Sequence, residues 1–420
     1  MENYRFDLGK PYSSIEEAMK DSEQVYKLDL RENQLEEVPV EILNFPNLTE
    51  LDLRRNKIKQ LPAWMYSLKK LKILKLGENR FFEFPAEIKA MMYLEEIEFR
   101  ENKITSLPEF IGGLLNLQKL SIGWNNLGKI PKSIGNLKRL KKLDLQYNNI
   151  RDLPETIGEI SSLQSINLSW NYLHSLPESF SKLKNLKEII LTENIFKEIP
   201  QPLCFLKELS KLNISWNQIR EIDDRIVGLI GLEDFDAHNN KILYIDPKIS
   251  YLKKLRHLSL RSNKLCGLPA QFNLLTSLRD IDLSENEFDE FPNVLCKTEG
   301  LRTINLRFNR IERIPSEISM LKELKELYLG SNRIKKLPDS MEQMKELQFL
   351  GLTQNKLVEF NSHLFYDGKL TGLFLGGNPI QDDLKGIEKI KSLQQLSLSE
   401  SVENKEKIRK KLSQISVYFQ

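Results

Sequence analysis

One row of side chains in this sequence has types and a spacing that could do chemistry. It consists of Asp234, His257 and Asp280, each 23 residues after the last. If each step of 23 residues adds one strand to a parallel sheet, neighbours in the row lie about 4.8 Å apart. A histidine between two carboxylates could hold a metal ion, and its pKa could rise. Aspartate is common at these positions, however, and a rigid sheet without a pocket seldom catalyses. We therefore predict a solvated acidic patch, with no catalytic residue and no metal ion.

Other signatures of catalysis or cofactor binding are missing from the sequence. It has no P-loop, no Gly-x-Ser-x-Gly elbow and no closely spaced cysteine and histidine set suited to zinc. The 420 residues include 62 lysines and arginines and 59 aspartates and glutamates, a net charge of +3. This balance does not favour nucleic acid or an anionic membrane, and no apolar run approaches the ~18 residues of a membrane span. We expect a non-enzymatic chain without a cofactor, a nucleic-acid partner or a membrane span.

The elements that position these side chains follow from an internal repeat. The stretch Leu48–Pro62, LTELDLRRNKIKQLP, recurs along the chain, and its asparagine returns every 23 residues, sixteen times in all. The sixteen asparagines are Asn33, Asn56, Asn79, Asn102, Asn125, Asn148, Asn171, Asn194, Asn217, Asn240, Asn263, Asn286, Asn309, Asn332, Asn355 and Asn378. A fixed period of this length is typical of a solenoid, in which each coil buries its apolar edge against its neighbours.

Each position of the repeat has a physical role. Leu51 and Leu53 alternate as in a short strand, so both point into the core. Asn56 follows the strand, where its side chain can bond backbone groups of its own and adjacent coils. Pro62 then fixes the backbone where the outer segment begins. The next apolar residues recur every three positions, which predicts a tight helical turn on the outside. These residues are Met65, Leu68 and Leu71.

The repeat L-x-x-L-x-L-x-x-N-x-L-x-x-L-P-x-x-I-x-x-L-x-x resembles the 23-residue class of leucine-rich repeats. This class is found in intracellular Ras-suppressor and Ras-group scaffolds of signal transduction and in stand-alone bacterial proteins. Residues Leu140–Leu163 fit it almost without exception. The resemblance implies an α/β solenoid, or horseshoe. Its concave face would be a parallel sheet of about 17 strands, and its convex side would be short helical or irregular segments. It also implies protein binding on the concave side. Some relatives carry a catalytic domain beside the repeats, and this chain is filled by its repeats and has no room for one.

The two ends differ from the repeats. We predict an N-terminal capping helix in residues 1–24, because Ser14-Ile-Glu-Glu17 has the form of a capping box. Repeats would fill residues 25–400, as sixteen full repeats and a terminal strand, and residues 401–420 would form a helix-strand cap. No secretory signal is visible, and Cys204, Cys266 and Cys296 are too far apart to pair. These features indicate a cytoplasmic protein.

The concave face carries the candidate binding residues. Four positions per coil point to solvent: two that alternate with the inward leucines, and two just before the asparagine. Over seventeen strands they hold 11 basic and 18 acidic residues, which argues against a phosphate-backbone ligand. The first four coils are densest in charge, and opposite charges on adjacent strands could pair there.

Aromatic residues mark the rest of that face. The position before the asparagine holds Trp124, Tyr147, Trp170, Trp216 and Phe308. Tryptophan and tyrosine dominate binding hot spots, so we predict a protein-binding row, although the rings could instead stack on one another as an inert ladder. Later coils add Tyr328, Phe349 and Phe374 beside glycines, as a second contact zone or a flat dimer face.

The sequence therefore predicts a non-enzymatic scaffold that binds a partner protein on its concave face and its aromatic edge. We expect a monomer. An effector protein that acts on host signalling after export is the alternative, and a metal-binding or hydrolytic protein is the least favoured one.

Overall fold

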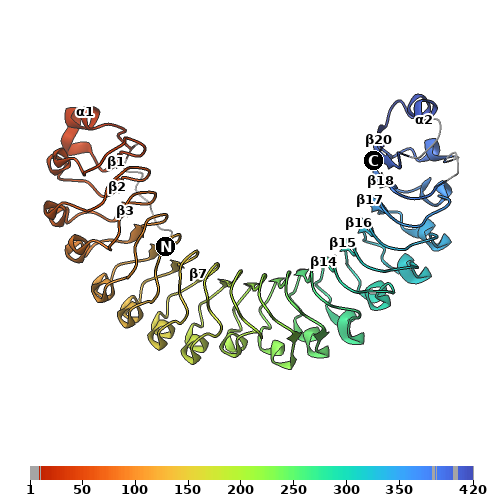
Figure 1. The fold of residues 1–420 in the computed structure, drawn as a ribbon, viewed down its shortest axis with the longest axis horizontal. Helices are drawn as coiled ribbons and strands as arrows, with labels where there is room; N and C mark the ends of the chain where they lie inside the picture. The colour runs from red at the N-terminus through yellow and green to blue at the C-terminus, as the bar shows by residue number, and fades with distance from the viewer. Residues whose placement is uncertain (1–8, 10, 381–383, 385, 401–404, 420) are drawn as a thin grey trace. The chain divides into compact units, whose positions relative to one another are not determined.

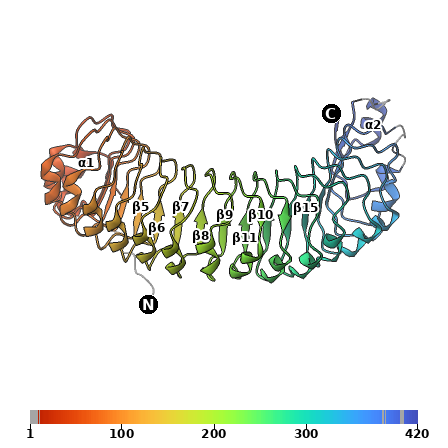
Figure 2. The ribbon, with the colours of Figure 1, turned by 60° about the horizontal axis from the view of Figure 1, so that its bottom comes forward.

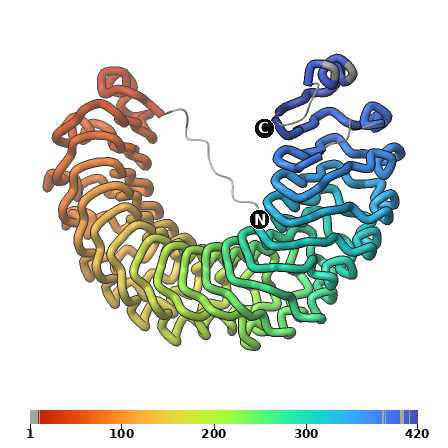
Figure 3. Tube along the Cα trace, turned by 45° about the vertical axis from the view of Figure 1, so that its right-hand side comes forward, coloured from red at the N-terminus to blue at the C-terminus, as the bar shows by residue number. Residues whose placement is uncertain are grey.

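Each 23-residue repeat forms one coil, with a short strand, a loop and a 3-10 helix, in the computed structural model (Figure 1). The structure describes residues 9, 11–380, 384, 386–400 and 405–419. These fall into two units, residues 1–196 with 200–209, and residues 197–199 with 210–420. Within each unit the strands line one side of the stacked coils and the 3-10 helices line the other (Figure 2). The backbone passes from each coil to the next in chain order, as the tube in Figure 3 shows.

The strands of the first unit pair in parallel, each with the next coil in register, so that Leu28, Leu51 and Leu74 share one row. They are β1 (Lys27–Asp29), β2 (Glu50–Asp52), β3 (Ile73–Lys75), β4 (Glu96–Glu98), β5 (Lys119–Ser121), β6 (Lys142–Asp144), β7 (Ser165–Asn167) and β8 (Glu188–Ile190).

The second unit repeats this arrangement. Its strands in the main sheet are β9 (Lys211–Asn213), β11 (Asp234–Asp236), β13 (His257–Ser259), β14 (Asp280–Asp282), β15 (Thr303–Asn305), β16 (Glu326–Tyr328), β17 (Phe349–Gly351), β18 (Gly372–Phe374), β19 (Gln395–Leu398) and β20 (Ser416–Phe419). The sheet thus has 18 strands among the described residues. The strand beyond the expected seventeen is β20, which lies in the predicted C-terminal cap and pairs in parallel with β19.

The outer segments are 3-10 helices, in which each backbone N–H donates to the carbonyl three residues earlier. This matches the three-residue spacing of their apolar side chains. The Met65 N–H donates to Pro62 O at 3.0 Å, and the Leu68 N–H donates to Met65 O at 3.1 Å. In the first unit the helices are η1 (Met19–Gln24), η2 (Val40–Asn44), η3 (Ala63–Ser67), η4 (Ala86–Ala90), η5 (Glu109–Gly113), η6 (Lys132–Asn136), η7 (Glu155–Glu159), η8 (Glu178–Lys182) and η9 (Gln201–Phe205). In the second unit they are η10 (Asp224–Gly228), η11 (Pro247–Tyr251), η12 (Ala270–Leu274), η13 (Asn293–Lys297), η14 (Ser316–Met320), η15 (Asp339–Gln343), η16 (Ser362–Phe365) and η17 (Ile387–Lys389).

Two repeats depart from the pattern where aspartate replaces the usual proline. The Asp223 and Asp246 side chains cap η10 and η11 by accepting backbone N–H groups, which proline cannot do. Unlike proline, Asp246 also has an N–H, which donates to Ile222 O at 2.8 Å. This bond adjoins a separate two-stranded pairing of β10 (Glu221–Ile222) with β12 (Tyr244–Ile245).

The ends contain the elements expected of caps. Helix α1 (Ile15–Ala18) begins at Ser14, whose hydroxyl accepts the Glu17 N–H at 3.1 Å. Just before it, Tyr12 forms a parallel bridge with Leu28, which occupies part of the edge of β1. At the other end, α2 (Lys405–Lys411) precedes β20. The cap boundaries stay predictions, and residues 1–8, 10, 401–404 and 420 of the two segments lie outside the described residues.

Candidate protein-binding face

The turn after each strand decides which side chains the strand face presents. The strand face is the surface formed, in every coil, by the first and third residues of the strand and by the two residues just before the asparagine. The residue just before the asparagine has a positive φ, for example 56° at Trp170. The chain turns inward there, so Asn171 is only 5% exposed whereas Trp170 is 44% exposed. The coils thus display the residue at this position, whatever its type, and in the coil of Asn378 that residue is Gly377, which has no side chain.

The buried asparagines tie successive coils together. The Asn171 amide donates to Leu145 O at 3.0 Å, in the preceding coil, and to Leu168 O at 3.1 Å in its own coil. Its Oδ1 accepts the Ile150 N–H at 3.0 Å. One side chain thereby satisfies backbone groups that would otherwise be buried without partners. The predicted ladder of asparagines is present.

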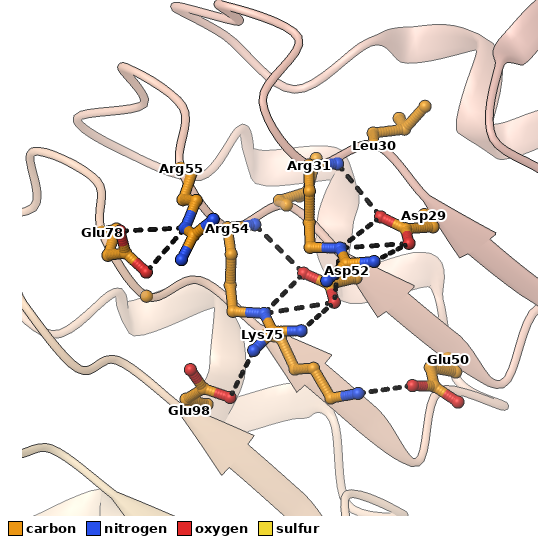
Figure 4. Close-up of polar contacts among 12 residues, drawn as sticks. Asp29, Leu30, Arg31, Glu50, Asp52, Arg54, Arg55, Lys75, Glu78 and Glu98 are labelled. Atoms are coloured by element: carbon orange, nitrogen blue, oxygen red, sulfur yellow. Dashed lines mark hydrogen bonds and ion pairs between the residues drawn. The ribbon is translucent and has the colours of Figure 1, made fainter. Parts of the chain in front are cut away.

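The first coils of the first unit carry a charged cluster on the strand face. Figure 4 shows its members Asp29, Arg31, Glu50, Asp52, Arg54, Arg55, Lys75, Glu78 and Glu98. Glu32, which pairs with Arg55, completes it. Lys75 Nζ lies 2.6 Å from Glu50 Oε1 on the adjacent strand, a pairing of the predicted kind. Arg55 reaches both neighbouring coils, 2.7 Å from Glu32 and 3.0 Å from Glu78.

The arginines of the cluster that lie two residues before the asparagine hydrogen-bond a carboxylate of their own coil. Each also lies 3.6 Å from a carboxylate of another coil, Arg31 from Asp52 and Arg54 from Glu98. Arg31 Nη2 lies 2.7 Å from Asp29 Oδ2, and Arg54 Nη2 lies 2.7 Å from Asp52 Oδ2. The hydrogen bond from Arg31 holds the pKa of Asp29 below its ordinary value. Sequence reasoning missed this pairing, although the repeated Asp-Leu-Arg tripeptide was a signal for it. The four basic and six acidic side chains of the charged cluster all pair within it, so the cluster offers few unpaired groups to a ligand.

Three of the predicted binding residues form an aromatic stack in the first unit. The Trp124 and Tyr147 ring centroids are 3.6 Å apart with planes inclined at 16°, and those of Tyr147 and Trp170 are 4.5 Å apart at 11°. The Arg100 guanidinium lies 5.7 Å from the Trp124 ring centroid. Tyr147 therefore has both ring faces covered by tryptophan, while Trp124 and Trp170 themselves stay exposed. The rings do stack as a ladder, and the ladder still presents a rigid aromatic ridge.

The other two aromatic residues at the position just before the asparagine, Trp216 and Phe308, are not part of the stack and belong to the second unit. Trp216 is 49% exposed and meets His238 edge to face, with centroids 6.4 Å apart. Phe308 is 55% exposed. The sequence period thus identified the shared position but did not show which rings touch.

The row of aspartates and histidine lies in register on the second unit, with Asp234 beside His257 and His257 beside Asp280. His257 Nδ1 lies 2.8 Å from Asp280 Oδ2, and His238 Nδ1 lies 2.7 Å from Asp236 Oδ1. Each histidine is thus held by one carboxylate. In the part of the chain that the structure describes, no group of three or more metal-ligating side chains is arranged around a common point.

The later candidates, Tyr328, Phe349 and Phe374, are half-buried in the second unit. Glycines on the next strand make room for two of these rings. A Cβ built on Gly351 would lie 3.1 Å from Tyr328 Cδ1, and one built on Gly372 would lie 2.5 Å from Phe349 Cδ1. The rings therefore lie against the sheet and form a low apolar shelf rather than a ridge.

Comparison with known proteins identifies the class. A family described as leucine-rich repeat region matches residues 24–127 and 101–231, and a second family, leucine rich repeat, matches residues 230–288 and 299–357. A leucine-rich repeat protein of Leptospira interrogans is 31% identical, with a TM-score of 0.87 over 98% of this chain and 100% of that one. The chain therefore belongs to the leucine-rich repeat family. Proteins of this family are typically protein-interaction scaffolds, and these matches indicate no enzymatic family.

Two further structures are similar. The ectodomain of a membrane receptor kinase from Arabidopsis thaliana, solved in complex with Casparian strip integrity factor 2, is 27% identical, with a TM-score of 0.63. The match covers 94% of this chain and 55% of that one. The Toll–Spätzle complex of Drosophila shares the fold. It is 19% identical, with a TM-score of 0.76, and the match covers 93% of this chain and 55% of that one.

The comparison with curated protein sequences gave no significant match. No helix in the described residues is long and apolar enough to cross a membrane.

Proposed function

We propose that this chain is a non-enzymatic scaffold that binds a partner protein through its strand face, with the aromatic stack as the main contact. The observation that carries the proposal is the stack itself. Its tryptophans are 38% and 44% exposed although their rings are held in place by Tyr147. Side chains that are already ordered lose little entropy on binding, and Trp and Tyr supply most hot spots.

A similar structure supports the proposal that the chain binds a partner. The plant receptor ectodomain, 27% identical, was solved in complex with Casparian strip integrity factor 2. The 23-residue form of the repeat further resembles that of Ras-group scaffolds, and we extend the proposal to a monomeric protein of the cytoplasm. The three cysteines are thiols, as in a reducing compartment, and burial raises the pKa of Cys296 to about 12, which keeps that thiol unreactive.

The test is capture of partners from a lysate of the source organism, identified by mass spectrometry, followed by affinity measurements with variants. Trp170→Ala should weaken binding of the captured partner roughly thirtyfold, because hot-spot truncations typically cost at least ~2 kcal/mol. Its own stability should fall by only about 1 kcal/mol, the contribution of one stacked ring pair.

Tyr172→Ala is the matched control. Tyr172 is 51% exposed in the same coil but follows the asparagine, outside the strand face. It should bind the partner as the parent does. If Trp170→Ala also binds like the parent, the aromatic stack is not the site, and the shelf around Phe349 and Phe374 becomes the better candidate.

A further inference from the structure

Arginine occupies the strand-face position two residues before the asparagine five times. The five are Arg31, Arg54, Arg100, Arg261 and Arg307. The first four each lie within 4.0 Å of a carboxylate, as Arg100 does at 3.4 Å from Glu101 and Arg261 at 2.6 Å from Glu285. Among the residues that the structure describes, Arg307 has no such partner.

Arg307 lacks a carboxylate because three positions differ. Asn305, Phe308 and Ser331 stand where the other arginines have Asp29 or Asp52, Glu101 and Glu285. Where Asp29 and Asp52 precede their arginines by two residues, Asn305 precedes Arg307. The Asn305 amide donates to Asp282 Oδ2 at 3.1 Å, and its Oδ1 accepts the Arg307 backbone N–H at 3.2 Å. An amide carries no charge, so Arg307 lacks the carboxylate that Asp29 and Asp52 supply to Arg31 and Arg54.

The guanidinium is nevertheless held in one place. It lies 4.3 Å from the Tyr328 ring centroid, a cation–π contact. Tyr328 is fixed in turn, because its hydroxyl donates to Glu326 Oε2 at 3.1 Å and its ring rests over Gly351. Stacking covers one face of the guanidinium and leaves its N–H groups available for a carboxylate.

A shallow pocket of about 360 Å³ adjoins this arginine. Gly330, Gly376 and Gly377 line it without side chains, Phe308 lies at one side, and Ser331 and Thr353 supply hydroxyls. A partner backbone can approach closely over glycines. The pocket lies next to the apolar shelf of Tyr328, Phe349 and Phe374 on the same coils.

We propose that this pocket and shelf bind an extended segment of a partner protein, which places an aspartate or glutamate side chain on Arg307 and uncharged residues over the shelf. The partner supplies the carboxylate that Asn305 does not. Thr303, Asn305 and Phe308 beside the arginine are uncharged. The nearby carboxylates of Asp282 and Glu326 already accept hydrogen bonds, from the Asn305 amide and the Tyr328 hydroxyl, and the segment runs past them with uncharged residues. The inference rests on the proposed use of the strand face for protein binding, but it concerns the other unit and can fail separately.

The experiment is selection of random twelve-residue peptides displayed as internal fusions, so that no peptide has a free carboxyl terminus. The full chain is the target. We expect the selected peptides to share one acidic residue among apolar ones. A synthetic, amidated copy should lose affinity at least about tenfold when that acidic residue becomes its amide, which removes one charge-assisted pair.

The protein variants locate the site. Arg307→Met keeps an apolar stem over Tyr328 and should lose affinity at least about tenfold, while Arg307→Glu should bind the peptide whose acidic residue is changed to lysine. Arg261→Met is the matched control, because Arg261 has the same position but is already paired with Glu285. Arg261→Met should bind the peptides like the parent.

Three outcomes would overturn the proposal: no peptide is selected, the selected peptides lack an acidic residue, or they bind Arg307→Met as tightly as the parent. Because Trp170 lies in the first unit, loss of binding in Trp170→Ala alone would assign the peptides to the aromatic stack instead.

Discussion

In the first unit Arg54 lies 2.7 Å from Asp52, whereas in the second unit Arg307 occupies the same position of its coil and rests on the Tyr328 ring. The aromatic rings on the strand face of the two units also pack differently. Those of Trp124, Tyr147 and Trp170 stack on one another at the turn, and those of Tyr328 and Phe349 lie over glycines of the next strand.

The difference shows how a uniform scaffold acquires distinct surfaces. The leucines and asparagines that build the coils are the same in both units, so the backbone presents equivalent positions throughout. Changing aspartate to asparagine or serine to glycine at those positions alters the surface without disturbing the core. The first unit satisfies its charges internally, and the second leaves a positioned cation beside an apolar shelf.

The largest expected effect tests whether the scaffold is equivalent in the two units. Asn171→Ala and Asn286→Ala should each reduce the free energy of unfolding by about 3 kcal/mol, because each leaves buried backbone groups without partners. Asn286 makes the same bonds as Asn171, to Leu260 O, Leu283 O and the Leu265 N–H.

Asn33→Ala is the control for this pair. Asn33 lies exposed in the first coil, where it donates to Arg31 O, and its loss should reduce stability by less than about 1 kcal/mol. Urea unfolding followed by circular dichroism measures all three. Unequal losses at Asn171 and Asn286 would show that the units do not share one scaffold.

A smaller effect concerns the glycines of the strand face. Gly372→Ala should destabilise the second unit by about 1–3 kcal/mol, since its Cβ would meet the Phe349 ring and force it from its place. Gly123→Ala, in the first unit, meets the Gln146 side chain first, which can move, so the change should stay within about 0.5 kcal/mol. The melting temperatures of both variants show whether strand-face glycines make room for aromatic rings in the second unit alone.

The smallest effect concerns the internal pairing of charge in the first unit. The pKa of Asp29 is lowered by its bond from Arg31, so the pair stabilises the fold above the ordinary carboxyl pKa near 3.8 and loses that contribution as the pH falls through the lowered value. Arg31→Met should therefore be slightly less stable than the parent at pH 7 and equal to it near pH 2. Nuclear magnetic resonance titration should show the Asp29 pKa returning toward its ordinary range, and an unchanged pKa would contradict the pairing.

The sequence by itself determined the scaffold. The 23-residue period required one strand per coil, the alternation of Leu51 with Leu53 assigned the core face, and the three-residue spacing after Pro62 predicted the 3-10 helices. These features are local or strictly periodic, so one repeat explains all sixteen. The shared position of Trp124, Tyr147 and Trp170 followed from the period in the same way, while their role in binding stays a prediction.

Only the tertiary structure decided how neighbouring side chains meet. That Arg31 turns back to Asp29, that Tyr147 lies between two tryptophans and that Arg307 rests on Tyr328 depend on rotamers chosen against residues 2, 21 or 23 positions away. The period places such residues side by side, but several partners lie within reach of each long side chain. Packing and charge across adjacent coils select one of them.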